Sequence, residues 1–384
     1  MSNPTPYTNW TSQHIQFMSH ALQLAQRAQG HTSPNPMVGA IIVRDGRVVG
    51  QGFHAQAGQA HAEIRALEEA QQLAVGATMY VTLEPCSHHG RTGPCTEAIV
   101  RAGIKEVIVA MLDPNPLVQG SGIARLQEAG IETKLGLLGD EAAELNEAFV
   151  TYITKKRPFI HFKTAMSLDG KVACHTGKSQ WITGEAAREE VHRLRSLHDA
   201  IMVGIGTILA DDARLNVRLS KHSDDQPVGT GDPIRIIVDS QGRLPLSARC
   251  LDGAGDDATV IVATTEMSTP SFRKALRDRG VRVWVGEPVN GRVPLKTLLY
   301  DLALFHITNI FVEAGPTLAG SLFDAQLIDR MTVFIAPLIL GGAQAPSPVA
   351  GVGADTPDLG QKLHNIKTAS FGNDIMITGQ LGKG

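Results

Sequence analysis

One histidine, one glutamate and two cysteines in the first third of the chain could bind zinc and use it. His61 and Glu63 stand in a His-Ala-Glu triplet, Cys86 follows a proline, and eight residues separate Cys86 from Cys95. A catalytic zinc takes three nitrogen or sulfur ligands and leaves its fourth position to water. His61, Cys86 and Cys95 would supply that set. Glu63 could carry the water's proton to a leaving amine without binding the metal, as a hydrolytic deaminase requires.

The same residues also allow a purely structural interpretation. A closed zinc site needs a fourth protein ligand, which His88 or His89 could supply, and buried cysteines can be inert. The coincidence of His-x-Glu, Pro-Cys and a strand–loop–helix context favours catalysis. Cys174 and Cys250 lie outside any ligand spacing, so we expect them to be bystanders.

Alternating strands and helices must position these residues. A helical pattern follows Thr11 and Ser12, either of which could cap it, and residues 39–53 predict a hairpin that turns at Asp45-Gly46. We expect further helices over 62–73, 96–102, 122–129 and 140–155, and strands over 77–83, 106–112 and 131–138. This alternation predicts an α/β sheet covered on both faces. The metal ligands would then lie at helix N-termini, where the helix dipole favours thiolate.

A second α/β domain is expected to follow the first without a flexible linker. The helix over 140–155 ends in three cations before Pro158, and a strand begins at Phe159, which predicts domains of residues 1–155 and 156–384. Further strands are expected over 234–239, 259–264, 281–285, 309–313 and 331–340, helices over 185–198, 271–278, 295–304 and 317–325, and surface loops over 220–231 and 252–257.

Composition narrows the class of protein. The chain has 384 residues, too many for one ordinary domain, and a formal net charge of −3. Residues 1–150 carry 9 Lys/Arg and 14 Asp/Glu, whereas the rest carries 26 and 24, so the first domain is a poor host for a polyanion. Four cysteines do not make a disulfide scaffold, and neither a signal peptide nor a bilayer-spanning run is visible. We expect a cytoplasmic enzyme that binds neither nucleic acid nor membrane.

The zinc pattern resembles the cytidine-deaminase-like zinc deaminases, whose signature is His-x-Glu followed by Pro-Cys-x-x-Cys. The longer gap between Cys86 and Cys95 departs from that signature. The block TLEPCSHHGRTGPC is instead similar to the riboflavin-biosynthesis deaminases, in which the longer insert is usual. TSPNPMVG at 32–39, His54 and DPNP at 113–116 match the same family, whereas Gly93 stands where the family usually has proline.

This resemblance implies a three-layer, cytidine-deaminase-like domain that binds zinc. Its implied substrate is 2,5-diamino-6-(5-phosphoribosylamino)pyrimidin-4-one, which loses its 2-amino group to water. Asn35 would contact the pyrimidine, and His54, His88 and Arg91 would hold other polar groups or phosphate. Each has an ordinary alternative: Asn35 between two prolines can form a turn, His54 can cap a strand end, and Arg91 can be solvated.

The second half contains motifs that are individually weaker. Residues 163–170 (KTAMSLDG) follow a strand and end in a turn, residues 179–184 (SQWITG) precede a helix that carries Arg188 and Arg195, and residues 313–321 (EAGPTLAGS) join a strand to a helix. Backbone amides at such a helix start could bind phosphate, although glycine often only makes the turn. No G-x-G-x-x-G follows the first strand, so a Rossmann fingerprint is absent.

Together with GTILADDARLNVR at 206–218, these motifs resemble the dihydrofolate-reductase-like reductase half of the same bifunctional family. The resemblance covers nearly the whole chain and implies that NADPH reduces the ribosyl C1′ of the deaminated product to a ribityl chain. The implied NADPH contacts are Ala165, Trp181, Thr207, Asp211, Ser240, Gly315, Pro316, Thr317, Leu318, Ala319, Gly320 and Ser321. The implied substrate contacts are Ser179, Arg195, Leu215, Arg218 and Glu313, with Lys163 and Asp169 as candidates for ring opening or proton delivery.

Several of these residues have other interpretations. Trp181 could belong to a core, Asp211 could cap a turn, and Glu313 could simply pair with Arg218. No residue by itself demonstrates a preference for NADPH over NADH. We expect a homodimer or higher homo-oligomer, because similar reductase folds often dimerise.

Three rival functions are also open. A nucleic-acid deaminase is disfavoured by the acidic first 150 residues and by the cysteine spacing. The others are a binding module that zinc only stabilises, and a single-activity deaminase whose second domain only binds.

Overall fold

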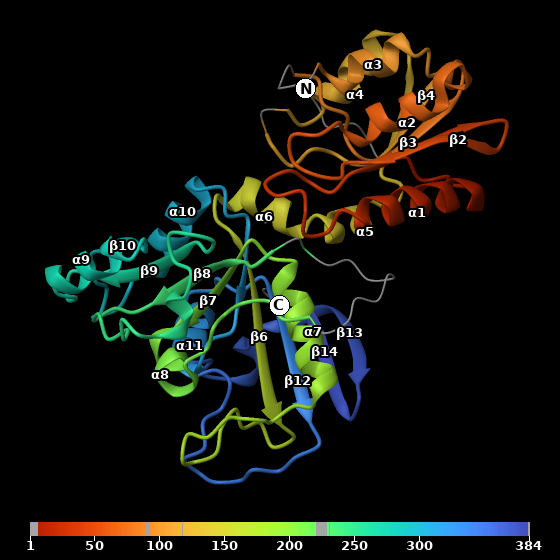
Figure 1. The fold of residues 1–384 in the computed structure, drawn as a ribbon. Helices are drawn as coiled ribbons and strands as arrows, with labels where there is room; N and C mark the ends of the chain where they lie inside the picture. The colour runs from red at the N-terminus through yellow and green to blue at the C-terminus, as the bar shows by residue number, and fades with distance from the viewer. Residues whose placement is uncertain (1–6, 89–92, 117, 220–228, 230, 383–384) are drawn as a thin grey trace. The chain divides into compact units, whose positions relative to one another are not determined.

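The computed structural model describes residues 7–88, 93–116, 118–219, 229 and 231–382 (Figure 1). Within it the chain forms two compact units, one built from residues up to Lys156 and the other beginning at Arg157. In the described residues no helix is both long and apolar enough to cross a membrane.

The first unit is built on a five-stranded sheet with the order β2-β1-β3-β4-β5. Its strands are β1 (Gly39–Arg44), β2 (Arg47–Phe53), β3 (Thr78–Leu83), β4 (Glu106–Met111) and β5 (Glu132–Leu135). The hairpin partners β1 and β2 are antiparallel, as are β1 and β3, whereas β3, β4 and β5 run parallel. Asp45 and Gly46, both at positive φ, make the predicted hairpin turn.

Helices cover both faces of this sheet, which makes three layers (Figure 1). Buried side chains of α2 (Ala62–Ala70), α3 (Cys95–Arg101) and α4 (Ser121–Glu128) pack on one face, and those of α1 (Ser12–Gln26) and α5 (Gly139–Leu145) pack on the other. Alternate residues of the strands point to the two faces, as in Ile41 and Ile42 of β1. The expected three-layer α/β arrangement is confirmed.

Glycines in β2 let α2 lie close to the sheet. A Cβ on Gly50 would come within 2.2 Å of the Ala66 carbonyl oxygen, and one on Gly52 within 2.6 Å of the Ala62 carbonyl oxygen. Any side chain at these positions would push the helix outward. The first turn of α2, which carries Glu63, is therefore fixed by backbone packing against the hairpin.

The helix predicted over 140–155 is in fact two helices, α5 and α6 (Glu147–Lys155), that meet at Asn146. The Asn146 side chain accepts a hydrogen bond from Met37 N at 2.8 Å and donates one to Met37 O at 2.9 Å. This pairing with a loop 109 residues away keeps the buried amide satisfied where the helix breaks. It also anchors the loop that carries Asn35.

The second unit is built on a nine-stranded sheet with the order β10-β9-β8-β7-β11-β6-β12-β14-β13. Its strands are β6 (Phe159–Ser167), β7 (Ala200–Gly204), β8 (Ile234–Val238), β9 (Val260–Thr265), β10 (Arg282–Gly286), β11 (Asn309–Val312), β12 (Arg330–Ala336), β13 (Lys362–Phe371) and β14 (Asp374–Gly382). All neighbours are parallel except β14, which is antiparallel to β12 and to β13.

Five helices in the described chain cover the two faces of this sheet (Figure 1). Cores form under α10 (Leu295–Leu304) and α11 (Pro316–Asp324), under α8 (Ile205–Asp211) and α9 (Pro270–Asp278), and under α7 (Glu185–Ser196). Parallel strands covered on both faces confirm the predicted second α/β domain.

Some elements of this unit differ from the sequence prediction. Residues 163–167 do not follow the first strand but belong to it, because β6 pairs with β12 as far as Ser167. The strand predicted over 331–340 ends at Ala336. The elements β7, α8, β13 and β14 were not predicted as regular structure.

Candidate active sites

His61, Cys86 and Cys95 come together at the edge of the first sheet. His61 is the N-cap of α2, Cys86 lies in the loop after β3, and Cys95 is the first residue of α3. The Nδ1 of His61 lies 3.3 Å from the Cys95 sulfur and 3.6 Å from the Cys86 sulfur. Ligands at ~2.0–2.3 Å from a tetrahedral zinc lie roughly 3.3–3.8 Å apart, so one nitrogen and two sulfurs at these distances fit that metal.

The same geometry shows how many protein ligands the zinc site has, and so whether it is a closed structural site. The ligand atoms of His61, Cys86 and Cys95 all lie within 4.8 Å of one another, and no further described residue joins them. His88 is exposed and does not belong to the group. His89 lies outside the described residues. Within the described chain the cluster has three protein ligands, the number that leaves a position open for water.

Glu63 lies in the first turn of α2, two residues after the ligand His61, and is only 3% exposed. Burial, followed by the neighbouring Cys86 charge, raises the pKa of the Glu63 carboxyl to about 6. A carboxyl group with a pKa near neutrality can both accept and donate a proton, which suits general acid–base catalysis.

Asn35 and His54 contact each other beside the cluster. Asn35 Nδ2 lies 3.1 Å from His54 Nε2, and His54 Nδ1 lies 3.3 Å from the Ala60 carbonyl oxygen. The carbonyl can only accept, so Nδ1 carries the proton and Nε2 accepts from the Asn35 amide. The ring of His54 is 2% exposed and meets that of His61 edge-on at 5.3 Å. His54 therefore orients Asn35, whose amide oxygen stays available.

Of the other two predicted substrate residues of this domain, the structure describes only His88. His88 is exposed in the loop after Cys86, close enough to Asp113 for their charges to interact. Arg91 lies outside the described residues.

Sequence reasoning passed over Glu84, although it stands inside the block TLEPC. Its buried carboxylate accepts hydrogen bonds from the backbone of the segment 113–123. A glutamate that directly follows a buried strand was the available signal.

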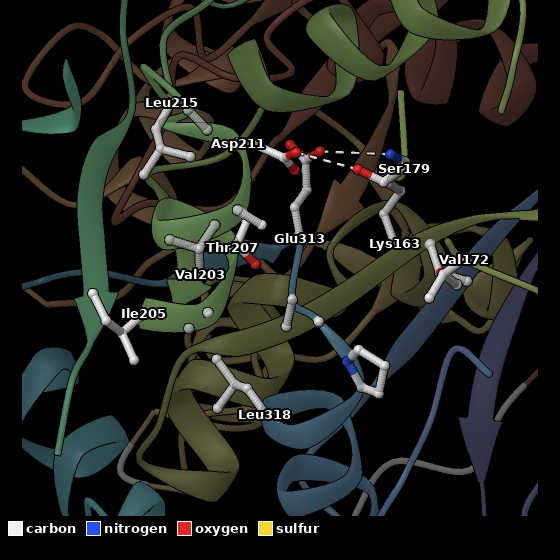
Figure 2. Close-up of a pocket in the computed structure, with 18 of the residues that line it drawn as sticks. Lys163, Val172, Ser179, Val203, Ile205, Thr207, Asp211, Leu215, Glu313 and Leu318 are labelled. Carbon is white, nitrogen blue, oxygen red and sulfur yellow. Dashed lines mark hydrogen bonds and ion pairs between the residues drawn. The ribbon is translucent and has the colours of Figure 1, made fainter. Parts of the chain in front are cut away.

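A cleft of about 1470 Å³ lies at the carboxyl ends of β7, β8 and β11 in the second unit. Ligands of parallel α/β sheets bind at this end of the strands. Most of the predicted residues line it: Lys163, Ala165, Ser179, Trp181, Arg195, Thr207, Asp211, Leu215, Arg218, Ser240, Glu313, Gly315, Pro316, Thr317, Leu318 and Ser321. Figure 2 shows several of them converging from β6, β11 and α8.

Glu313, just beyond β11, is the centre of a charged group in this cleft. Arg195 Nε and Nη2 both donate to its carboxylate, the second at 3.1 Å. Lys163 Nζ lies 3.5 Å from Oε2 (Figure 2). Burial alone would raise the pKa of Glu313, but the charges of Arg195 and Lys163 lower it to about 2. Burial lowers the pKa of Lys163, and Glu313 opposes that shift. Glu313 thus offsets part of the cost of burying two cations.

Arg218 is not the partner of Glu313. Its guanidinium donates to Asn216 Oδ1 and its backbone N–H to His192 Nδ1 at 3.2 Å. The alternative in which Glu313 pairs with Arg218 is therefore wrong for this structure. Arg218 lines the cleft, and its guanidinium contacts Asn216 rather than Glu313.

Ser179 and Trp181 lie on the wall of the cleft facing α8. The Ser179 hydroxyl donates to Asp211 Oδ1 at 3.2 Å, and Asp211 is the last residue of α8. Trp181 is 68% exposed, with the Arg188 guanidinium 4.6 Å from its ring centroid. Trp181 is therefore not a core residue but an exposed aromatic surface held by a cation–π contact.

Three predicted site residues do not line the cleft. Asp169 accepts hydrogen bonds from Ser167 Oγ at 2.6 Å and from Leu340 N and Gly341 N, which lower its pKa to about 2. A carboxylate tied up in this way fixes a turn and is a poor proton donor. Ala319 and Gly320 lie on the buried side of α11, where a Cβ on Gly320 would come within 2.2 Å of the Ala350 carbonyl oxygen. Their roles are in packing.

Comparisons with known proteins agree with both sites. Residues 158–377 match the RibD C-terminal domain, and residues 11–111 match the cytidine and deoxycytidylate deaminase zinc-binding region. The riboflavin biosynthesis protein RibD of Aquifex aeolicus is 43% identical over 361 residues, 94% of this chain and 96% of its own. RibD of Escherichia coli K12 is 43% identical over 330 residues, 85% of this chain and 88% of its own.

Solved structures of related proteins also resemble nearly the whole chain. RibD of Acinetobacter baumannii is 40% identical with a TM-score of 0.84, covering 97% of this chain and 99% of its own. A diaminohydroxyphosphoribosylaminopyrimidine deaminase/5-amino-6-(5-phosphoribosylamino)uracil reductase of Thermotoga maritima is 34% identical with a TM-score of 0.81, covering 97% of this chain and 100% of its own.

The fold and the two sites therefore define a zinc-dependent deaminase joined to a reductase that uses a nicotinamide cofactor, both acting on small pyrimidines. Neither a purely structural zinc module nor a second domain that only binds fits these relatives. The chain belongs to the RibD family and is a bifunctional enzyme of riboflavin biosynthesis.

Proposed function

We propose that the first unit removes the 2-amino group of 2,5-diamino-6-(5-phosphoribosylamino)pyrimidin-4-one, and that the second uses NADPH to reduce the ribosyl group of the product to a ribityl chain. The observation that carries this is the presence, in one chain, of a three-ligand zinc cluster beside a buried glutamate and of a cleft centred on Glu313. The name of the Thermotoga maritima relative states the same two activities in the same order. We place the domains at residues 1–155 and 156–384.

In the deaminase, His61, Cys86 and Cys95 would hold zinc, whose chemistry is to make a bound water acidic enough to attack the ring. Glu63 would take the proton of the attacking water and pass it to the leaving amine. Asn35 would orient the pyrimidine through its amide oxygen, because its N–H group already donates to His54. His88 and Arg91 would hold the polar groups and phosphate of the ribosyl chain.

In the reductase, residues that line the cleft would hold a nicotinamide cofactor, whose chemistry when bound would be hydride transfer to C1′ of the sugar. Opening of the ribose ring leaves negative charge on the ring oxygen, which needs a proton. Lys163 is the group we assign to that step, because it is a buried ammonium with a lowered pKa at the centre of the cleft. Asp169 does not line the cleft and is not assigned this role. Because Glu313 neutralises Arg195, Arg218 is the better candidate for the substrate phosphate.

The choice of NADPH over NADH rests on cations that line the same cleft. Arg243, Arg249 and Arg292 contribute to its wall together with Ser240. Arg249 is paired with Asp212 at 2.8 Å, whereas Arg292 is held against α11 by a hydrogen bond to Ser321 Oγ at 3.0 Å. Arg292 and Arg243 are therefore the candidates for the additional 2′-phosphate.

A homodimer and a cytoplasmic location complete the proposal. The strand β13 lies at one end of the nine-stranded sheet, and its Ile366 is 58% exposed. An exposed sheet edge with apolar side chains suits pairing with a second copy. Light scattering of the purified protein measures the oligomeric state. Thiolate metal ligands and a reduced nicotinamide favour a reducing compartment.

The experiment that tests the proposed function supplies the diaminopyrimidine ribotide with and without NADPH and follows ammonia and ribityl product. We expect ammonia in both reactions and ribityl product only with NADPH. NADH at equal concentration serves as the cofactor control. Zinc-loaded protein that releases no ammonia from this compound would contradict the proposed substrate, and equal turnover with NADH would contradict the proposed cofactor preference.

A further inference from the structure

Glu84 is a buried charge in the deaminase unit that the mechanism above does not use. It follows β3 directly, stands two residues before Cys86, and is 6% exposed. Four backbone amides donate to its carboxylate: Asp113 N at 3.2 Å and Gly120 N at 2.9 Å to Oε2, and Gly122 N at 2.8 Å and Ile123 N at 3.2 Å to Oε1. A buried carboxylate is tolerated because these donors replace water.

The four amides belong to a single segment that runs from the end of β4 into α4. The N-cap of α4 is Gly120, which offers no side chain to the free amides of the first turn. The carboxylate of Glu84, which directly follows β3, accepts hydrogen bonds from these amides. The positive end of the helix dipole favours its negative charge. One side chain thus holds both Asp113 after β4 and the first turn of α4.

The loop that carries Cys86 packs directly on this segment. A Cβ on Gly122 would come within 2.1 Å of the Pro85 carbonyl oxygen, so α4 lies against the peptide next to the ligand. The Ser87 and Ser121 hydroxyls form a hydrogen bond of 2.8 Å, which is a second contact between this loop and α4. On the other side of Cys86, Cys95 N donates to its sulfur at 3.3 Å.

The DPNP sequence at 113–116 also depends on Glu84. Asp113, whose own N–H donates to Glu84, accepts a hydrogen bond from Asn115 N at 2.8 Å, and its charge interacts with that of His88. The carboxylate of Glu84 therefore fixes one metal ligand and the loop that faces the predicted substrate residue His88. Cys86 and Asp113 lie in the loops after β3 and β4, so no interaction between sequence neighbours would hold them together.

We propose that Glu84 is a positioning residue of the deaminase, which holds residues 85–87 around Cys86, together with Asp113 and the first turn of α4, in the geometry that the metal and substrate need. It does not touch the reacting atoms. The proposal depends on the deaminase activity but not on the identity of its substrate, because the metal site reports on it directly.

The test is the full-length variant Glu84→Gln. Glutamine keeps one acceptor oxygen but turns a donor toward two backbone N–H groups, so half of the contacts are lost. The matched control is Glu106→Gln, a glutamate of the adjacent β4 that pairs with Lys134 and has no contact with the Cys86 loop among the described residues. Both variants lose the same charge from the same sheet.

Three measurements separate positioning from folding. The first is affinity for zinc in competition with a chelator, the second is the thiolate-to-metal charge-transfer absorption of the cobalt-loaded protein, and the third is KM and kcat for ammonia release. Reduction of deaminated substrate by the same preparation reports whether the second unit is intact.

For Glu84→Gln we expect zinc affinity or deaminase kcat/KM to fall by ~10–100-fold, the usual effect of losing a residue that orients a metal ligand, together with a shifted cobalt spectrum and unchanged reduction. Glu106→Gln should leave all of these values at wild-type level. A Glu84→Gln protein with wild-type metal affinity, spectrum and KM would overturn the proposal.

If Glu84→Gln does not fold, Glu84→Asp decides, because it keeps the charge but is one methylene too short to reach all four amides. A decrease of a few-fold in metal affinity or a rise in KM supports the proposal. Wild-type values for both quantities overturn it.

Discussion

Burial determines what the carboxyl group of Glu63 can do. The side chain is almost fully removed from solvent beside three metal ligands, and its raised pKa of about 6 lets it exchange protons near neutral pH. Glu63→Gln preserves the shape and removes proton transfer, so we expect ammonia release to fall by ~10²–10⁴-fold while zinc content stays the same. Ammonia release and metal stoichiometry on one preparation check this. Retained deamination would contradict the general acid–base role, and loss of zinc would indicate a structural one.

At the same scale, Glu313 controls the charge of its neighbours in the reductase cleft. Because Glu313 raises the pKa of Lys163 against the effect of burial, Glu313→Gln should lower that pKa further. The alkaline limb of the reduction rate should then move to lower pH, and the loss of one partner from a buried ion pair should destabilise the unit by about 3–5 kcal/mol.

The pH profile of ribityl formation and urea unfolding measure these effects. Glu190→Gln, which breaks an ion pair with Arg193 outside the lining of the cleft, is the control. An unchanged alkaline limb would show that Lys163 is not the proton donor.

Among the elements, sequence patterns predicted structure well where a helix or turn is marked by its own periodicity, capping residue or turn residues. Leu295–Leu304 was predicted to the residue, and Thr11 caps α1 as expected. The break at Asn146 was missed because its cause is a hydrogen bond to Met37, far away in sequence. The strands β13 and β14 were missed because much of β13 is exposed and shows no regular alternation of polar and apolar residues.

The same distinction between local and long-range causes holds for the sites. The His-x-Glu and Pro-Cys patterns and their local context suggested the zinc ligands, because each ligand sits at a recognisable helix or loop start. The grouping of Lys163, Arg195 and Glu313 requires three separate elements to meet, which the sequence motifs do not state. Asp169 was a reasonable candidate in its motif, but its partners are the backbone amides of residues 340 and 341.

A chain of hydrogen bonds joins α7, β6 and β12 of the second unit and depends on neutral histidines. His198 Nδ1 lies 2.7 Å from the Leu194 carbonyl oxygen, so Nε2 accepts from His161 Nδ1 at 3.1 Å, and Thr332 Oγ1 donates to His161 Nε2 at 2.8 Å. Burial lowers the pKa of His198 to about 4, and that of His161 well below its ordinary value. Arg330 adds to both shifts, whereas Asp199 opposes the one at His198.

We therefore expect acid to weaken this unit through the two histidines. Their pKa values are lower in the folded than in the unfolded chain, so protons favour unfolding. Stability is fully present above about pH 6.5 and falls as the pH drops toward 4, by about 1.4 kcal/mol per pH unit for each histidine. Urea unfolding at about pH 7 and about pH 5 measures the loss. In His198→Gln the difference between the two pH values should shrink, and an equal difference would contradict the role of this pair.

At the scale of the whole molecule, each chemistry is contained in one unit. All described zinc-site residues precede residue 96, and all residues that line the reductase cleft lie between Lys163 and Pro346. Zinc removal should therefore affect only the first activity. After treatment with a strong chelator we expect ammonia release to stop, deaminated substrate still to be reduced at the original rate, and added zinc to restore ammonia release. Parallel loss of both activities would show instead that the metal stabilises the entire chain, since the reductase cleft contains no ligand of the zinc cluster.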